Sequence, residues 1–260
     1  MNTGLEFSGE VTRRLERIYT TRDVIAQRAE TLNALALQPG ESVLDIGSGP
    51  GFLAHEMGRV VGPRGRVRGI DISESMVALA RSRCADHFWI AIESGKADRL
   101  PFPDAHFDAA VSVQVYEYVD DISASLSEVH RILRPGGRVV ILDTDWDSIV
   151  WHTSDPARLG RILAAWDEHL VDPHLPRTLG TRLKQAGFRT QRCSVHTLLN
   201  TGYDPGTFSY GMSDLIAEFV SGRGKVTPTE VGAWIDDLRA LKERGEYFFS
   251  LNRYLFLAVK

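Results

Sequence analysis

The first half of the chain alternates short apolar runs with segments of helical spacing. This alternation is typical of a parallel sheet covered by helices, because parallel neighbours need long crossover connections. It therefore predicts five parallel strands. The predicted strands are 42–46, 66–72, 88–92, 107–115 and 138–143, the predicted helices are 24–37, 52–61, 74–85 and 122–133, and breaks are predicted at 93–106 and 134–137.

The second half has a different pattern. Residues 144–176 carry aromatic residues and histidines around a helical segment near 157–170, without a strand pattern. A short helix at 179–186 ends at Gly187, as a glycine in the left-handed C′ position requires. Strands are predicted at 188–199 and 247–259, and the long helical and Gly-rich connection between them is typical of a lid or binding element.

Composition excludes several classes of protein. The 260 residues are 43% hydrophobic and 25% charged, which is ordinary for a globular protein. A net charge of −4 argues against a nucleic-acid partner. The longest apolar run, 254–259, is far shorter than the roughly 20 residues that cross a bilayer, so no membrane insertion is expected. Two cysteines and an N-terminus without the features of a secretory signal predict a cytoplasmic location.

The strongest chemical signal is the segment VLDIGSGPGF, which leads from a strand into a helix. Gly47, Gly49 and Gly51 allow a tight turn and the close approach of a nucleotide-like ligand. An NAD fingerprint needs glycines at relative positions one, three and six, but Phe52 falls at the sixth position here. Pro50 also lacks an amide donor for a pyrophosphate. A dehydrogenase is therefore disfavoured.

Asp71 ends the second predicted strand, twenty residues after Gly51. A carboxylate at this spacing accepts hydrogen bonds from both hydroxyls of an unphosphorylated ribose. The alternative is a helix-capping role, with Ser73 as the N-cap of the following helix.

Four ordered blocks carry a family resemblance: VLDIGSGPG, GIDISESMVALAR, GKADRLPFPDAHFDAAVS and LSEVHRILRPGGRVVILD. With them the chain resembles the class I S-adenosylmethionine-dependent methyltransferases, especially the small-molecule group that includes the ubiquinone and menaquinone C-methyltransferases. The resemblance implies an α/β fold with a Rossmann-like, doubly wound, seven-stranded and mostly parallel sheet, an antiparallel last strand, and helical insertions that form a substrate lid. It implies one methyltransferase domain over 1–260, with a cofactor-binding core at 37–143 and substrate-pocket insertions at 144–176 and 201–245.

The resemblance also implies roles for individual residues toward S-adenosylmethionine. Asp45 and Gly47 would face its methionine part, Gly49 its sugar, Asp71 its ribose, and Ile72, Met76, Ala97, Asp98 and Leu100 its adenine, with Gln114 beneath the cofactor. In the N-terminal stretch, Tyr19 would close over the sulfonium and Arg28 would pair with the methionine carboxylate. Acidic groups suit this cofactor because it is a sulfonium cation without phosphate.

Candidate acceptor residues follow the fourth and fifth strands, where ligands bind in open α/β sheets. Tyr116, Glu117 and Tyr118 follow the fourth strand, and Tyr116 is a catalytic candidate. His152, after the fifth strand, is the first candidate for a general base. Trp146 and Trp151 are candidates for stacking on an aromatic acceptor, and the lid candidates are Phe208, Tyr210, Met212, Asn252 and Arg253, although core packing is an equally good reading of these side chains.

The predicted function is methyl transfer from S-adenosylmethionine to a small organic acceptor through oxygen, nitrogen or carbon. The alternatives are a non-catalytic sensor or scaffold that binds the cofactor, and an NAD-dependent oxidoreductase. Two distant cysteines disfavour arsenite chemistry, and no metal site is predicted from Asp143, Asp145 and Asp147 because alternating strand residues do not converge on one ion. A monomer and a homodimer both remain open.

Overall fold

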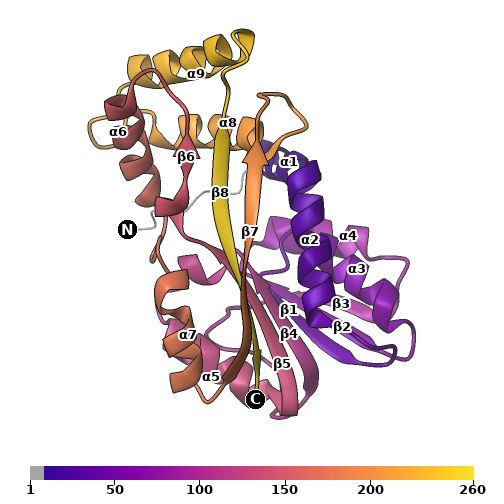
Figure 1. The fold of residues 1–260 in the computed structure, drawn as a ribbon. Coiled ribbons are helices and arrows are strands. Elements are labelled where there is room, and N and C mark those ends of the chain that lie inside the picture. The colour runs from indigo at the N-terminus through magenta and orange to yellow at the C-terminus, as the bar shows by residue number, and fades with distance from the viewer. Residues whose placement is uncertain (1–8) are drawn as a thin grey trace. The chain divides into compact units, whose positions relative to one another are not determined.

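The computed structural model describes the backbone of residues 9–260 and the side chains of residues 14–260 (Figure 1). Residues 1–8, where the sequence lacks the features of a secretory signal, lie outside this part. Contacts divide the chain into two compact units. The sheet unit comprises Gln27–Asp145, His174–His196 and Arg253–Lys260, and the helical unit comprises residues 9–26, Trp146–Pro173 and Thr197–Asn252.

The sheet unit is built on five parallel strands, as the alternation of the sequence predicts. These are β1 (Ser42–Ile46), β2 (Arg66–Asp71), β3 (Ile90–Ser94), β4 (Phe107–Val113) and β5 (Leu133–Thr144). Their order is β3-β2-β1-β4-β5. The last strand, β8 (Phe249–Val259), pairs antiparallel with β5, and β7 (Arg189–Asn200) pairs with β8. The predicted antiparallel last strand is therefore confirmed.

Helices cover both faces of this sheet because successive strand side chains point to opposite sides. On one face, α5 (Ile122–Ile132) and α7 (Pro176–Gln185) pack against strand residues such as Leu44 (Figure 1). On the other face, α3 (Phe52–Val61) and α4 (Glu74–Arg83) pack against residues such as Val43. The two apolar cores of a doubly wound fold result.

The helical unit has a separate apolar core. It contains α1 (Gly9–Tyr19), the start of α2 (Arg22–Leu35), α6 (Pro156–Asp167), α8 (Phe208–Val220), α9 (Pro228–Glu243) and the short strand β6 (Val150–Trp151). β6 pairs with the first residues of β8 through Trp151 and Phe249, and both side chains are buried. The prediction of no strand in 144–176 is wrong here, because a two-residue strand is too short to show a period-two pattern. The helix α1 also went unpredicted.

The largest difference from the predicted elements is the start of β5. The predicted break at 134–137 is wrong, because β5 begins at Leu133. Leu133 is fully buried and pairs with Phe107, and the register then shifts between Phe107 and Ala109. Gly136 lies in this irregular part of β5 and adopts a φ of +78°, which favours glycine. Burial of one leucine thus extends the strand through a Pro-Gly-Gly segment.

A search of the helices in the described residues finds none with the length and apolar character needed to span a membrane.

Candidate functional site

The glycine loop lies between β1 and α3, at the carboxyl end of the parallel sheet. Gly47, Gly49 and Gly51 adopt φ values of +69°, +51° and +82°, a region that favours glycine. The backbone N–H of Ser48 donates to the Ile70 carbonyl oxygen at 2.9 Å, which ties the loop to β2. The three glycines of the motif are therefore required by the backbone conformation itself.

Close packing adds a second requirement for glycine. A Cβ on Gly47 would lie 2.2 Å from Cγ2 of Val115, and a Cβ on Gly51 would lie 2.8 Å from Cα of Ala80. Such distances are well inside van der Waals contact. The loop thus passes close to the segment that follows β4 and to α4, and leaves no room for side chains at these two positions.

Asp71 ends β2 and faces this loop. Its Oδ2 accepts the backbone N–H of Gly49 at 2.8 Å, and its Oδ1 accepts the backbone N–H of Ser73 at 2.9 Å. Burial raises the pKa of Asp71, although hydrogen bonds from backbone amides act in the opposite direction. Since a carboxylate has about four lone-pair sites, Asp71 keeps acceptor capacity for a further donor. Ser73 also caps α4 by accepting the N–H of Met76 at 3.4 Å, as predicted.

Asp45, in the buried strand β1, is 2% exposed. Its Oδ2 has no hydrogen-bond partner among the described residues. Burial, and to a smaller extent the neighbouring Asp71, raise its pKa to about 7. A buried carboxyl group with an unpartnered oxygen is costly, and it is a site for a cationic or donor group of a ligand.

The remaining residues predicted for the adenine differ widely in exposure. Ile72, which follows Asp71 in the chain, is 69% exposed. Ala97 is half-buried and Asp98 is exposed, whereas Met76 and Leu100 are buried. The backbone of Leu100 is held by Glu128, whose Oε2 accepts its N–H at 2.8 Å.

Gln114 follows β4 with φ +57°, a strained value for a residue with a side chain. Its Nε2 donates to the Leu142 carbonyl oxygen at 3.3 Å and its Oε1 accepts the Thr144 hydroxyl at 2.6 Å, which holds this conformation. Tyr116 is fully buried in the apolar core, and burial next to Asp143 raises the pKa of its phenol. Its hydroxyl has no partner among the described residues.

Sequence reasoning did not anticipate a buried carboxyl pair after β4 and β5. Asp143 is fully buried, and its Oδ1 accepts the N–H of Val115 at 3.1 Å. Burial and the nearby Glu117, which is also buried, raise the pKa of Asp143 well above its ordinary value. Both acidic residues can be seen in the sequence, but only the fold brings Asp143 and Glu117 close together.

The N-terminal candidates lie in different units. Tyr19 packs partly buried against the apolar core of the helical unit. Arg28 lies in the sheet unit, where its Nε donates to Glu56 Oε1 at 2.7 Å. Its guanidinium carbon is also 5.0 Å from the centroid of the Phe52 ring, at the start of α3.

His152 lies in the helical unit and is exposed. Its backbone N–H donates to the Phe248 carbonyl oxygen at 2.9 Å. Both residues line an apolar cavity of about 460 Å³, a volume suited to a small molecule. The other lining residues are Val150, Trp151, Thr153, Pro156, Leu159, Gly160 and Leu163.

The aromatic and lid candidates are mostly core residues. Trp146, Trp151, Phe208 and Met212 are buried in the core of the helical unit, and Tyr210 packs partly buried against it. Asn252 Oδ1 accepts the Thr197 hydroxyl at 2.8 Å. Arg253 is buried in the sheet unit, where it donates to Gln27 Oε1.

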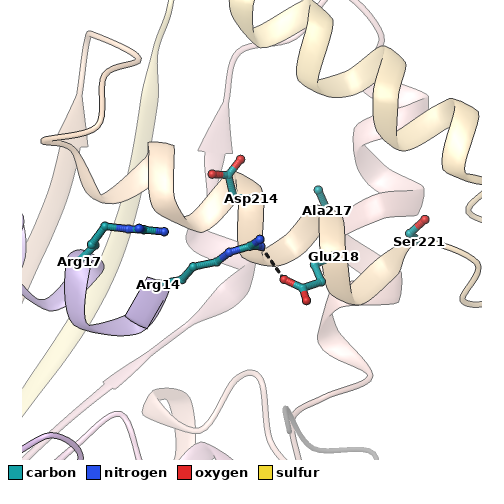
Figure 2. A pocket seen from close by; sticks show the side chains of 6 residues that line it. All are labelled: Arg14, Arg17, Asp214, Ala217, Glu218 and Ser221. Atoms are coloured by element: carbon teal, nitrogen blue, oxygen red, sulfur yellow. Dashed lines mark hydrogen bonds and ion pairs between the residues drawn. The ribbon is translucent and has the colours of Figure 1, made fainter. Parts of the chain in front are cut away.

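A second cavity, of about 610 Å³, lies between α1 and α8 and is lined by Arg14, Arg17, Asp214, Ala217, Glu218 and Ser221 (Figure 2). Arg14 donates to Glu218 at 2.6 Å across it. Its lining includes none of the predicted cofactor or acceptor residues. The two arginines and the two acidic residues that line it carry opposite charges of equal number.

Comparison with known proteins agrees with this geometry. The model of a methyltransferase domain family matches residues 44–141. An uncharacterised 37.1 kDa protein in a transposon of Streptomyces fradiae is 31% identical over 94% of this chain and 70% of its own length. A ubiquinone/menaquinone biosynthesis C-methyltransferase of Hahella chejuensis is 38% identical over 44% of this chain, and the match spans only 47% of that enzyme.

Among solved structures, that of a Bacillus halodurans protein ascribed to the methyltransferases superposes with a TM-score of 0.65 at 18% sequence identity. The match covers 90% of this chain and 99% of the Bacillus chain. That similarity establishes the fold. Together with the glycine loop, the oriented Asp71 and the unpartnered oxygen of Asp45, the methyltransferase-domain match and the methyltransferase relative establish the family. The chain belongs to the class I S-adenosylmethionine-dependent methyltransferases, the family whose cofactor is S-adenosylmethionine.

Proposed function

We propose that the protein transfers a methyl group from S-adenosylmethionine to a small organic acceptor, and that residues 37–143 bind the cofactor. The observation that carries the proposal is the arrangement of Asp71 and Asp45 around the glycine loop. Asp71 is oriented by two backbone amides, and a buried oxygen of Asp45 lacks a partner among the described residues. Neither group suits a pyrophosphate, whereas both suit a cationic cofactor with a free ribose.

The residues of the sheet unit fit the parts of this cofactor. Asp71 would accept hydrogen bonds from the ribose hydroxyls, and Asp45 and Gly47 would face the methionine part. The exposed Ile72 would gain an apolar contact from the adenine. Met76, Ala97 and Leu100 would also contact the adenine, and Asp98 would accept from its exocyclic amine. Gly49 would lie under the sugar and Gln114 beneath the cofactor. Arg28 pairs with Glu56, so a role toward the methionine carboxylate would require this ion pair to rearrange.

When bound, S-adenosylmethionine supplies an activated methyl group whose transfer is an in-line displacement. The tasks of the protein are then alignment and exclusion of water. We propose that segments 144–176 and 201–245 bind the acceptor, and that a ring nitrogen of His152 takes its proton where the acceptor is protonated. The apolar cavity lined by His152 and Phe248 favours a largely apolar acceptor. Tyr19 would lie against the sulfonium, and the burial of Tyr116 favours a supporting role for this residue over direct proton transfer.

The comparisons favour methyl transfer over a non-catalytic sensor and over an NAD-dependent oxidoreductase. The quinone C-methyltransferase among the relatives makes quinone precursors the first acceptors to test. We also propose a reducing, cytoplasmic location, which the two free cysteines support, and no nucleic-acid partner, which the acidic charge supports.

Calorimetric titration tests the cofactor assignment. S-adenosylhomocysteine should bind the purified protein at micromolar strength, and NAD should not bind. Binding of NAD without binding of S-adenosylhomocysteine would refute the proposal. Mass-spectrometric screening of phenols, amines and quinone precursors for the gain of one methyl group would then identify the acceptor.

A further inference from the structure

Phe52 occupies the position at which a dinucleotide-binding loop carries its third glycine, and it is the first residue of α3. Its ring lies beneath the guanidinium groups of two arginines. The guanidinium carbon of Arg83 is 3.6 Å from the ring centroid, and that of Arg28 is 5.0 Å away. The departure from the dinucleotide pattern therefore has a structural counterpart, because a glycine at this position would offer no surface for either cation.

Arg83 also holds the backbone of the glycine loop. Its Nε donates to the Pro50 carbonyl oxygen at 2.8 Å. Ala80 of α4 and Cys84, the residue that caps its C-terminus, contact the next loop residue: Ala80 lies against Gly51, and Cys84 Sγ is 3.9 Å from the Gly51 carbonyl oxygen. Residues 80, 83 and 84 share one face of a helix. This face of α4 is thus the wall against which the loop packs.

This face of α4 adds a restraint to a loop whose glycine residues are intrinsically flexible. Three glycines have wide backbone freedom, and Pro50 has no N–H to donate. The amides of Ser48 and Gly49 are bound on the β2 side, by Ile70 and Asp71. On the α4 side, Arg83 supplies the short hydrogen bond to a loop carbonyl. A planar guanidinium can donate to that carbonyl and stack on Phe52 at the same time, whereas a lysine ammonium lacks the planar surface for stacking.

We infer that Arg83 is a positioning residue for the cofactor loop: by binding the Pro50 carbonyl and stacking on Phe52, it holds the loop in its binding conformation before the cofactor arrives. A loop ordered in advance loses less conformational entropy on binding, so affinity is higher. This inference rests on the proposed placement of the cofactor at the glycine loop.

The matched control is Arg81, two residues earlier on α4. Its Nε also donates to a backbone carbonyl at 2.8 Å, but that carbonyl belongs to Ile92 in β3. The variants Arg83→Ala, Arg83→Lys and Arg81→Ala are compared with the parent by calorimetric titration with S-adenosylhomocysteine, by thermal unfolding, and by amide exchange of the peptide that covers the loop.

We expect Arg83→Ala to raise the Kd for S-adenosylhomocysteine about tenfold, Arg83→Lys to have an intermediate Kd, and Arg81→Ala to bind like the parent. Both alanine variants should lower Tm by similar amounts, and only Arg83→Ala should speed amide exchange in the ligand-free loop. Parent-like affinity of Arg83→Ala, or an equal loss in Arg81→Ala, would overturn the positioning role. Absence of binding by the parent would instead refute the proposed function.

Discussion

The backbone N–H of Gly49 donates to Oδ2 of Asp71 at 2.8 Å, so the end of β2 orients the glycine loop that follows β1. The same carboxylate accepts the N–H of Ser73 through Oδ1. Asp71 thus joins two strand ends and the start of α4. Its position next to the loop is the geometric basis of the cofactor assignment.

Replacing Asp71 should therefore weaken cofactor binding. We expect Asp71→Ala to weaken S-adenosylhomocysteine binding by more than about tenfold, because charge-assisted hydrogen bonds to the ribose are lost. Asp71→Asn should bind with intermediate strength, since one oxygen remains as an acceptor. Calorimetric titration measures both variants. Affinity unchanged in Asp71→Ala would remove this residue from the ribose site.

Cofactor binding should depend on pH through Asp45, whose pKa is raised to about 7. A cation binds the ionised carboxylate better, so the affinity for S-adenosylmethionine should rise as pH increases through about 7 and fall below it. Asp45→Asn should weaken binding at pH 8 and flatten the pH profile. Titrations from pH 6 to pH 8 check this expectation, and an equally steep profile in Asp45→Asn would contradict it.

The same shift predicts an opposite effect on stability. The pKa of Asp45 in the folded state lies above the ordinary value of 3.8, so the folded state favours the protonated carboxyl group. The stability of the folded state therefore decreases as pH rises from about 4 to about 7. At pH 8, ligand-free Asp45→Asn should therefore have a Tm a few degrees above that of the parent. A gain of roughly 1 kcal/mol or more in the free energy of unfolding produces a shift of this size. Thermal unfolding at pH 8 measures the difference, and a lower Tm would speak against a destabilising charge.

The packing of Gly47 can be separated from its backbone conformation. Gly47 and Gly40 both have positive φ, but a Cβ would meet Val115 at 2.2 Å in the first case and nothing within 4 Å in the second. Gly47→Ala should therefore lower the free energy of unfolding by about 2 kcal/mol more than Gly40→Ala. Urea unfolding measures both variants. Equal losses would show that conformation alone requires glycine at position 47.

In the helical unit, α8 is capped by residues distant in the sequence. Oδ2 of Asp23 accepts the backbone N–H of Phe208 at 2.8 Å and the side-chain amide of Asn200 at 3.0 Å. Asp23→Ala should destabilise this unit by about 1–3 kcal/mol, because the backbone N–H of Phe208 and the side-chain amide of Asn200 both lose this acceptor. Asp236→Ala, which removes an exposed pair with Arg239, should change stability by less than about 0.5 kcal/mol. Urea unfolding of both variants decides whether the two effects differ.

The proposed role of His152 as the general base can be tested once an acceptor is known. His152→Ala should reduce turnover with a protonated acceptor about a hundredfold, as loss of a general base does, and leave S-adenosylhomocysteine affinity unchanged. His130→Ala provides a comparison at a histidine of α5 in the sheet unit that lies outside both proposed acceptor segments. Equal turnover in His152→Ala and the parent would exclude His152 as the base.

Local sequence patterns determined most of the sheet unit. The bounds of β1 and α3 agree with the prediction, because a buried apolar run ends in a glycine turn and a helical period begins at Phe52. Ser73 caps α4, and Gly187 adopts φ +93° after α7, since short-range hydrogen bonds and steric limits act within a few residues. The cofactor family followed from the same local motifs.

Tertiary structure decided what depends on distant neighbours. It extended β5 back to Leu133, paired the two-residue β6 with β8, and buried Tyr116 in the core. It also brought Arg83 to Phe52 and removed Asp45 from water, which raises the pKa of that carboxyl group. The physical reason is that burial, packing and desolvation arise from residues far apart in the chain, so the sequence names the groups and only the fold sets their environment.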